Sequence, residues 1–205
     1  MTERLPWEPD VYIPADLAVS LREPLARNED PRPWCAAKAA ELLGPAGNSR
    51  QEKKLAQCLA WYVAYFATQV PLIGAALFFQ PDFSHLPPWG TAKIEAFGEH
   101  PERGPLTMAI MREFYEKPDE LSFGETELTE TEVSVGRALR IHRFRKTKPD
   151  RRRSPIGEEL VWLIWPPDTT AILAIAVRWS ESKHSEAGIS IADDMARNFR
   201  TRPRG

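Results

Sequence analysis

Two apolar runs decide the fold: Glu159-Leu160-Val161-Trp162-Leu163-Ile164-Trp165 and Ala171-Ile172-Leu173-Ala174-Ile175-Ala176-Val177, on either side of the turn Pro166-Pro167-Asp168-Thr169. Apolar segments of strand length that are separated by turn-forming residues predict a β-hairpin, here over residues 158–179. Both strands are apolar at odd and at even positions, so we expect helices to cover the sheet on both faces. The side chains expected to be buried in this hairpin are Trp162, Ile164, Leu173 and Ile175.

An amphipathic helix is predicted after the hairpin. From Ser182 onward, Ile191, Met195 and Phe199 recur at the spacing of one helical face, and charged residues occupy other positions. Pro203 is expected to end this helix. A hairpin core that is closed by a terminal helix predicts an α+β fold, with a mainly antiparallel sheet.

Upstream of the hairpin, the chain alternates between extended and helical patterns. Residues 11–21 predict a short strand, interrupted by a proline and therefore placed at an edge of the sheet. A helix of about ten residues is expected to end at Gly44-Pro45, and a longer one, capped by Asn48 or Ser49 with Glu52 completing a capping box, should end at Pro71. Strands over 72–79 and 92–97 and a helix over 105–116 complete the pattern.

The longer helix carries an aromatic stripe, Trp61-Tyr62-Tyr65-Phe66. Such a stripe could form a ligand box, but aromatic residues at helical spacing are more typical of core packing. We therefore expect these four side chains to pack in the core.

Residues 122–147 hold the sharpest charge pattern of the chain. Four glutamates precede the turn near Gly136, and five basic residues follow it: Glu125, Glu127, Glu130 and Glu132, then Arg137, Arg140, Arg143, Arg145 and Lys146. The pattern predicts a second hairpin whose opposite charges face each other across the strands. Because Glu125 and Glu127 differ in parity from Glu130 and Glu132, either a bulge intervenes or the glutamates do not share one face.

The basic half of this hairpin continues into further cationic residues and is the candidate interaction surface. It consists of Arg143, Arg145, Lys146, Lys148, Arg151, Arg152 and Arg153. Such a stretch suits an acidic protein partner or a nucleic acid. The acidic strand beside it is expected to neutralise much of its field, which makes nucleic-acid binding the weaker hypothesis.

Length and charge limit the possible classes of protein. A chain of 205 residues suits a single domain, which we place over residues 1–205 with a proline-rich N-terminal lead over residues 1–10. The net charge of -2 gives no general attraction to polyanions. The N-terminus lacks the pattern of a signal peptide, and the apolar stretch 55–79 is interrupted by polar residues and a proline, so we expect a cytoplasmic protein with no membrane partner.

Candidate catalytic residues are dispersed in the sequence. Cys35 and Cys58 lie in helical patterns among apolar residues and are expected to be reduced, buried thiols. The histidines share no metal-binding spacing, and we expect loop positions for His85 and His100, a solvated strand position for His142 and a helix start for His184. The sequence contains no GxSxG, HExxH, GxGxxG or GxxxxGK[ST] motif, so we predict no enzyme, no cofactor and no metal site.

The C-terminal half of the chain resembles a known group of proteins. The resemblance rests on Gly136-Arg137-Ala138-Leu139-Arg140-Ile141, on the run from Leu160 to Trp165, and on Ile191-Ala192-Asp193-Asp194-Met195. In these segments the sequence is similar to uncharacterised actinobacterial proteins with a PsbP-like α+β fold. This resemblance implies an antiparallel sheet sandwiched by helices, and a function in binding other macromolecules rather than in catalysis. It supplies no catalytic residues.

Three functional hypotheses follow. The first is a non-catalytic interaction or assembly protein that binds another protein. The second is a small-molecule-binding protein or enzyme with a pocket near the loop 81–104. The third is a weak nucleic-acid binder that uses the basic stretch 137–153. A deep pocket would favour the second hypothesis, and a surface of a single charge around Arg143 and Arg145 would favour the third.

Overall fold

The fold is described from a computed structural model of the chain, over residues 7–10, 12–14, 18–27, 29–69, 72–83, 85–99, 104–146, 155–167 and 169–203. The described strands are β1 (Trp7–Asp10), β2 (Ala18–Ser20), β3 (Leu72–Phe78), β4 (Gly90–Phe97), β5 (Ser122–Val133), β6 (Gly136–Lys146), β7 (Ile156–Trp165), β8 (Ile172–Trp179) and β9 (Arg200–Pro203). The described helices are α1 (Arg22–Ala26), α2 (Arg32–Leu43), α3 (Ser49–Ala67), α4 (Met108–Glu116) and α5 (Ser185–Arg197), with short 3-10 turns at Gly44–Ala46 and Ser182–His184.

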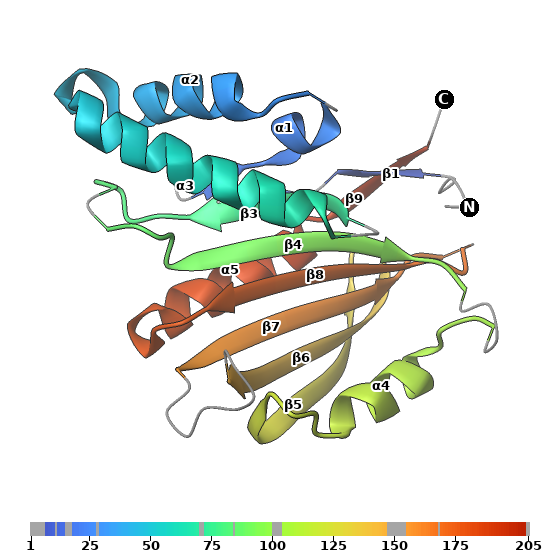
Figure 1. The fold of residues 1–205 in the computed structure, drawn as a ribbon. Helices are drawn as coiled ribbons and strands as arrows, with labels where there is room; N and C mark the ends of the chain where they lie inside the picture. Colours follow the sequence, from blue (N-terminus) through green and yellow to red (C-terminus); the bar gives the residue numbers. More distant parts are fainter. Residues whose placement is uncertain are drawn as a thin grey trace.

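Seven of the strands form one sheet in the order β2-β3-β4-β8-β7-β6-β5. Every neighbouring pair in this sheet is antiparallel. The predicted hairpin over 158–179 is present as β7 and β8, which lie inside the sheet, whereas β2 and β5 form its two edges (Figure 1). The edge position expected for the first strand of the sheet is therefore confirmed.

Helices cover both faces of the sheet, as the sequence predicts. On one face, Ile191 and Met195 of α5 are buried together with side chains of β3, β4, β7 and β8. On the other face, α2 and α3 pack on β2 and β3, while α4 packs over β6, β7 and β8. In Figure 1, α3 and α4 lie in front of opposite halves of the sheet and α5 lies behind it. This arrangement confirms the α+β class with a mainly antiparallel sheet.

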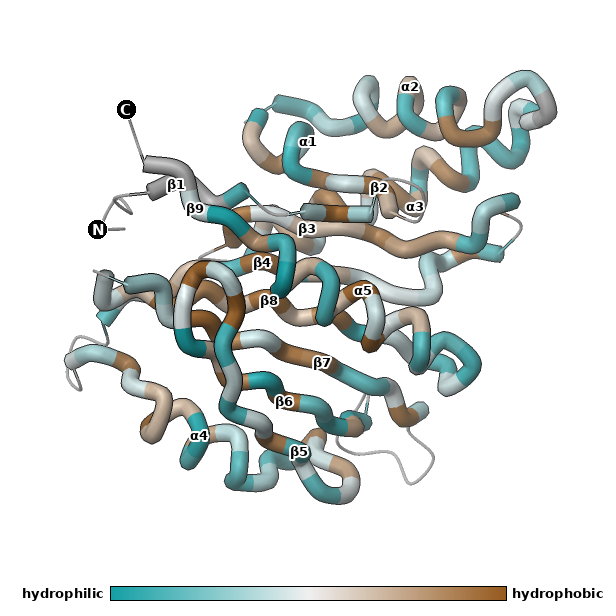
Figure 2. The backbone as a smooth tube through the Cα atoms, turned by 180° about the vertical axis from the view of Figure 1, so that it is seen from behind, coloured by the Kyte–Doolittle hydropathy of each residue, from teal (hydrophilic) through white to brown (hydrophobic). Residues whose placement is uncertain are grey.

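The hairpin of β7 and β8 forms the centre of the core. Ile164, Leu173 and Ile175 are fully buried, and Trp162 is 5% exposed. Figure 2 shows hydrophobic residues along both strands. Full burial of such a side chain stabilises the fold by about 1.5 to 3 kcal/mol, so an apolar pattern alone is enough to place these strands in the core.

The two ends of the described chain pair with each other in a second, small sheet. β1 and β9 are antiparallel, with Trp7 opposite Pro203 and Asp10 opposite Arg200. The described part of the predicted N-terminal lead is thus a strand. The helix α5 ends at Arg197 rather than at Pro203, because Asn198 caps it by donating from Nδ2 to the carbonyl of Asp194 at 2.9 Å.

The charged hairpin is present as β5 and β6, with a bulge in β5. Phe123 pairs with Phe144 and Glu127 pairs with His142, so the three residues between Phe123 and Glu127 lie opposite Arg143 alone. Gly124 supplies the positive φ of 76° in this bulge. Beyond it, Glu127 points to the α5 face and Glu130 to the α4 face. Both options left open by the sequence therefore apply.

The expected charge pairing between β5 and β6 is wrong for most of the arginines. Their carboxylate partners are elsewhere in the fold: Arg140–Asp193 at 3.0 Å, Arg143–Glu159 at 2.6 Å and Arg145–Asp119 at 2.7 Å. The pairs that join β5 to β6 are longer: Arg137–Glu130 at 3.7 Å and His142–Glu127 at 3.6 Å. Charges attract more strongly where water is excluded, so Arg140 and Arg143 pair with the buried acids Asp193 and Glu159.

The N-terminus of α3 is capped as predicted by Asn48. Its Oδ1 accepts hydrogen bonds from the backbone N–H groups of Arg50 and Gln51 at 3.1 and 3.0 Å. The Gln51 side chain completes the capping box by accepting from the backbone of Asn48. The predicted partner Glu52 is one residue too far along the helix for this role.

Core packing of the α3 aromatic stripe is confirmed for Phe66, which is 3% exposed, and in part for Tyr62, which packs against the same cluster. Tyr62 is half-buried, while Trp61 and Tyr65 are 60% and 43% exposed. The rings of Trp61 and Tyr65 lie parallel to each other with centroids 5.5 Å apart. The stripe is wider than the helix face that contacts the sheet, so its outer half faces solvent.

Both cysteines are free thiols. Cys35 is buried, and Cys58 is half-buried rather than buried as expected. Burial raises the pKa of the Cys58 thiol to about 11. A thiol with a raised pKa holds little of the reactive thiolate at neutral pH, in keeping with a packing role for both residues.

Candidate functional site

Two adjacent glutamates at the beginning of β7 mark the most unusual region of the fold. Glu158 is 8% exposed and Glu159 is 2% exposed. Successive residues of a strand point to opposite faces of a sheet, so Glu159 lies on the face of α3 and α4, and Glu158 on the face of α5. Because a buried carboxylate is costly unless it is paired, each position requires partners.

The partners of Glu159 come from the strands on both sides of it. The register places Arg143 of β6 and Arg178 of β8 directly opposite Glu159. Arg143 Nε and Nη2 lie 2.7 and 2.6 Å from Oε2, and Arg178 donates from Nε to Oε1. A third guanidinium, that of Arg145, lies 3.7 Å from Oε2. Arginine therefore pairs with both oxygens of this carboxylate.

Residues outside the sheet hold two of these arginines in place. The guanidinium carbon of Arg143 lies 4.7 Å from the ring centroid of Tyr115 in α4, which is a cation–π arrangement. Arg145 donates from Nη2 to Asp119 at 2.7 Å. The cluster thus connects α4 and the segment after it to the centre of the sheet.

The charges of this cluster stabilise one another. Burial alone would raise the pKa of the Glu159 carboxyl, but the charges and hydrogen bonds of Arg178 and Arg143 outweigh burial and hold the pKa below its usual range. Burial lowers the pKa of Arg178, but the charge of Glu159 outweighs it and the pKa is raised. Both groups are therefore ionised at neutral pH.

A cavity of about 370 Å³ lies beside Glu159 where β4, β6, β7 and β8 begin or end. Its wall includes Tyr62 of α3, Trp89 and Thr91 at the start of β4, and Arg178 at the end of β8. Burial raises the pKa of Tyr62 to about 12, so its hydroxyl stays neutral. Among the described residues that line this cavity, three are cations and two are carboxylates: Arg145, Lys146 and Arg178 against Glu158 and Glu159. The cavity is therefore bordered by an excess of positive charge.

The surroundings of Glu158 are different, although the residue is the direct neighbour of Glu159. Its cross-strand neighbours are Phe144 of β6 and Trp179 of β8. Its carboxylate accepts a hydrogen bond on Oε1 from the Ser185 hydroxyl, and His142 Nε2 lies 3.3 Å from Oε2. Glu158 therefore has a hydroxyl and an imidazole as partners where Glu159 has guanidinium groups.

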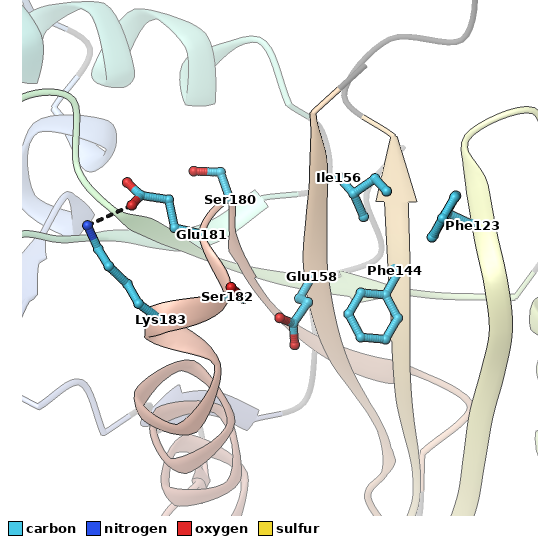
Figure 3. A pocket seen from close by; sticks show the side chains of 8 residues that line it. All are labelled: Phe123, Phe144, Ile156, Glu158, Ser180, Glu181, Ser182 and Lys183. Atoms are coloured by element: carbon cyan, nitrogen blue, oxygen red, sulfur yellow. Dashed lines mark ion pairs between the residues drawn. The ribbon is translucent and has the colours of Figure 1, made fainter. Parts of the chain in front are cut away.

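A second hollow, of about 570 Å³, opens on the side of Glu158. Its lining residues are Phe123, Phe144, Ile156, Glu158, Ser180, Glu181, Ser182 and Lys183. Figure 3 shows the three apolar side chains on neighbouring strands at one side of the hollow, Glu158 between them and the polar segment, and Glu181 paired with Lys183 at the other side. The two hollows share Glu158 and Ser180.

Two glycines let the elements around Glu158 come close together. A Cβ atom at Gly188 of α5 would lie 2.5 Å from the ring of Trp179, and one at Gly157 would lie 2.8 Å from the carbonyl oxygen of Trp179. Any larger residue would push α5 or β8 away. Trp179 in turn donates from Nε1 to Ser185 Oγ at 3.5 Å, which connects this packing to the hydroxyl that binds Glu158.

The candidate interaction surface falls partly within this region. Arg143 and Arg145 have side chains that are 11% and 20% exposed and are occupied with carboxylates, and Lys146 lines the cavity beside Glu159. Lys148, Arg151, Arg152 and Arg153 lie outside the described residues. The structure thus brings three of the seven residues together at one end of the sheet.

Of the three histidines in the described residues, two lie where the sequence placed them. His142 was expected at a solvated position, but its side chain is only 13% exposed because it lies between Glu158 and Glu127. His184 occupies the N-cap position of α5, without a capping hydrogen bond from its side chain, and stacks on Trp89 with ring centroids 4.7 Å apart. His85 is exposed in a loop, and His100 lies outside the described residues.

The hydrogen bonds around Ser185 define what this group of side chains can do chemically. Its hydroxyl donates to the Glu158 carboxylate, and the imidazole of His142 contacts the other oxygen of the same carboxylate. The arrangement is therefore that of a carboxylate held in a fixed orientation at the wall of the hollow.

The described residues contain no group of three or more His, Cys, Asp or Glu side chains arranged to hold a metal ion. None of the helices in the described ranges is long and apolar enough to cross a lipid bilayer.

Sequence reasoning missed the pair Glu158 and Glu159 as a site. The signal was present, since two acids stand in succession at the start of a run that is otherwise apolar on both parities. Strand alternation places such a pair on opposite buried faces. Their partners depend on the strand register, which the sequence pattern alone does not define.

The sequence matches no known protein-family profile, and no curated protein matches it. The similarity to actinobacterial PsbP-like proteins therefore remains a prediction.

Proposed function

We propose that this chain is a non-catalytic interaction protein that binds an acidic segment of another protein at the end of the sheet where β6, β7 and β8 meet. The observation that carries the proposal is the excess of positive charge around the 370 Å³ cavity beside Glu159. Half of the Arg178 side chain is exposed there, so its guanidinium can reach a partner while Nε stays on Glu159.

Two further features support this proposal. In the sequence, Lys148 and Arg151 to Arg153 follow Lys146 closely and add positive charge to the same part of the chain. The exposed, stacked rings of Trp61 and Tyr65 stand on α3, the helix that also supplies Tyr62 to the cavity. Aromatic and arginine side chains are enriched in the energetically important parts of protein interfaces.

The proposal is tested with a fluorescently labelled decaglutamate peptide, titrated with the protein and followed by fluorescence anisotropy. Wild-type protein should bind it with an affinity that falls as salt is added, because exposed charges are screened. Replacement of Arg151, Arg152 and Arg153 together by Glu should abolish binding. The matched control changes Arg50, Lys53 and Lys54 to Glu, an equal change of charge at exposed positions in the first half of α3.

Two results would contradict the proposal. One is equal affinity of the triple variant and the wild-type protein for decaglutamate. The other is tighter binding to duplex DNA than to decaglutamate at physiological salt, which would support the nucleic-acid hypothesis instead.

A second candidate function is the binding of a small molecule in the same cavity. The specific observation in its favour is that Pro88, Trp89, Gly90 and Thr91, from the loop 81–104 and the strand that begins in it, line the cavity. A volume of about 370 Å³ lies within the usual range for ligand sites. A screen of small anions by thermal shift, repeated on Trp89→Ala, tests this function.

A further inference from the structure

The hollow beside Glu158 has two unlike walls. One wall consists of Phe123 of β5, Phe144 of β6 and Ile156 of β7, which are 46%, 39% and 39% exposed. Three large apolar side chains that are exposed together on neighbouring strands are unusual on a protein surface and mark binding sites. Figure 3 shows them gathered at one side of the hollow.

The opposite wall accepts hydrogen bonds. It contains the carboxylates of Glu158 and Glu181 and the hydroxyl groups of Ser180 and Ser182. Lys183 is the one cation among the lining residues that the structure describes, and its Nζ lies 2.6 Å from the Glu181 carboxylate. This wall therefore suits a ligand group that donates hydrogen bonds and carries positive charge.

Glu158 has capacity for such a group. An ionised carboxylate offers about four lone-pair sites, and the contacts with Ser185 and His142 use two of them. These same contacts hold the carboxylate, which is 8% exposed, in one orientation at the edge of the hollow. The ring of Phe144, directly opposite Glu158 in the strand register, adds an aromatic surface beside it.

We propose that this hollow binds a small amine with an apolar body. The ammonium group donates to Glu158, and the body of the ligand lies on Phe123, Phe144 and Ile156. A volume of about 570 Å³ is typical of small-molecule sites, and the face of Phe144 stabilises a neighbouring cation. This site adjoins the cavity proposed for an acidic partner, with which it shares Glu158 and Ser180, and it has the opposite charge preference.

The test compares three ligands of equal chain length by isothermal titration calorimetry: hexylamine, hexanol and hexanoate. Hexylamine should bind saturably at one site. Its affinity should exceed that of hexanol by about tenfold, which corresponds to one hydrogen bond to a charged group. Hexanoate should not bind, since it would meet the carboxylates of Glu158 and Glu181.

Variants test the contributions of the acidic wall and of the apolar wall separately. Glu158→Gln should weaken hexylamine by about tenfold and leave hexanol unchanged. Phe144→Ala should instead weaken both ligands, because it removes apolar surface, and hexylamine more than hexanol, because it also removes the aromatic face beside the cation. Ile156→Lys, at an exposed position, should abolish hexylamine binding through charge repulsion. If Glu158→Gln does not fold, this variant still tests the site. The matched control is Phe114→Ala on α4, where the side chain is 65% exposed and outside the hollow.

Three outcomes would overturn the amine site. The first is no saturable binding of hexylamine at millimolar concentrations. The second is binding of hexanoate as tight as that of hexylamine. The third is hexylamine affinity that is unchanged in folded Glu158→Gln and Ile156→Lys proteins.

Discussion

Glu158 and Glu159 are neighbours in the sequence, yet they lie on opposite faces of β7 and are surrounded by different kinds of side chain. Glu159 is flanked in the sheet by Arg143 and Arg178, and Glu158 by Phe144 and Trp179. One carboxylate is surrounded by opposite charge, and the other is held by a hydroxyl and an imidazole. The difference shows that the surrounding side chains, rather than the residue type, decide what a buried acid does.

The two acids have different roles. Glu159 is satisfied within the protein and contributes to the stability of the sheet and to the position of three arginines. Glu158 retains hydrogen-bonding capacity toward a hollow. We therefore expect changes at Glu159 to affect stability most, and changes at Glu158 to affect binding most.

The largest expected effect follows from Glu159→Gln. The change leaves Arg143, only 11% exposed, without a counter-charge, and breaking a buried pair in this way costs about 3 to 5 kcal/mol. Urea denaturation should show this loss in the free energy of unfolding. The matched variant Glu158→Gln removes no ionic partner of an arginine and should lose about 1 kcal/mol. Equal losses in the two variants would remove the proposed distinction between the faces.

The second prediction concerns the stability of the protein at acidic pH. The pKa of Glu159 lies below its ordinary value of 4.5, so above pH 4.5 its contribution to stability is complete, and it is lost as the pH falls through the lower pKa of the folded state. The unfolding free energy of the wild-type protein should therefore decrease as the pH is lowered below 4.5. Glu159→Gln should show a weaker decrease than the wild type. A curve for Glu159→Gln parallel to that of the wild type would contradict this prediction.

A smaller effect is expected from Arg143→Lys. Lysine keeps the charge but lacks the planar fork that contacts Glu159 through two nitrogens and stacks over Tyr115. The loss should be about 1 to 2 kcal/mol, from one charged hydrogen bond and the cation–π contact. The control is Arg178→Lys, where the side chain is 50% exposed and a loss below about 1 kcal/mol is expected. Chemical denaturation of both variants measures the difference, and a larger loss for Arg178→Lys would reverse the order of the two arginines.

The smallest effect is expected from Ser185→Ala. It removes one donor from the Glu158 carboxylate, and a single hydrogen bond contributes about 1 kcal/mol to stability. If Glu158 serves the hollow, this variant should also bind hexylamine less well, because its carboxylate is less firmly oriented. Unchanged hexylamine binding would show that Ser185 has a purely structural role.

The sequence predicts the parts of the fold that depend on local patterns. The apolar runs on both sides of Pro166 and Pro167 give β7 and β8, and Asn48 gives the start of α3. These features need only a periodicity or a capping residue within one segment. The covered faces of the sheet follow from the same apolar pattern.

The candidate site depends on contacts that no local pattern contains. The contact between Arg143 and Glu159 requires the register of β6 on β7, and this register is independent of the bulge that disturbs the pairing of β5 with β6. Similarly, helical spacing predicts that the aromatic side chains of α3 share a face, but not that this face extends beyond the sheet and leaves Trp61 and Tyr65 in solvent.

The edge strand β5 has a consequence for how copies of this protein behave at high concentration. An unpaired strand edge is a template for a strand of another molecule, and long edges promote aggregation. The outward edge of β5 carries the exposed residues Glu125, Glu127, Glu130 and Glu132. Two copies that met along this edge would bring these glutamates together, and repulsion between like charges would oppose the pairing.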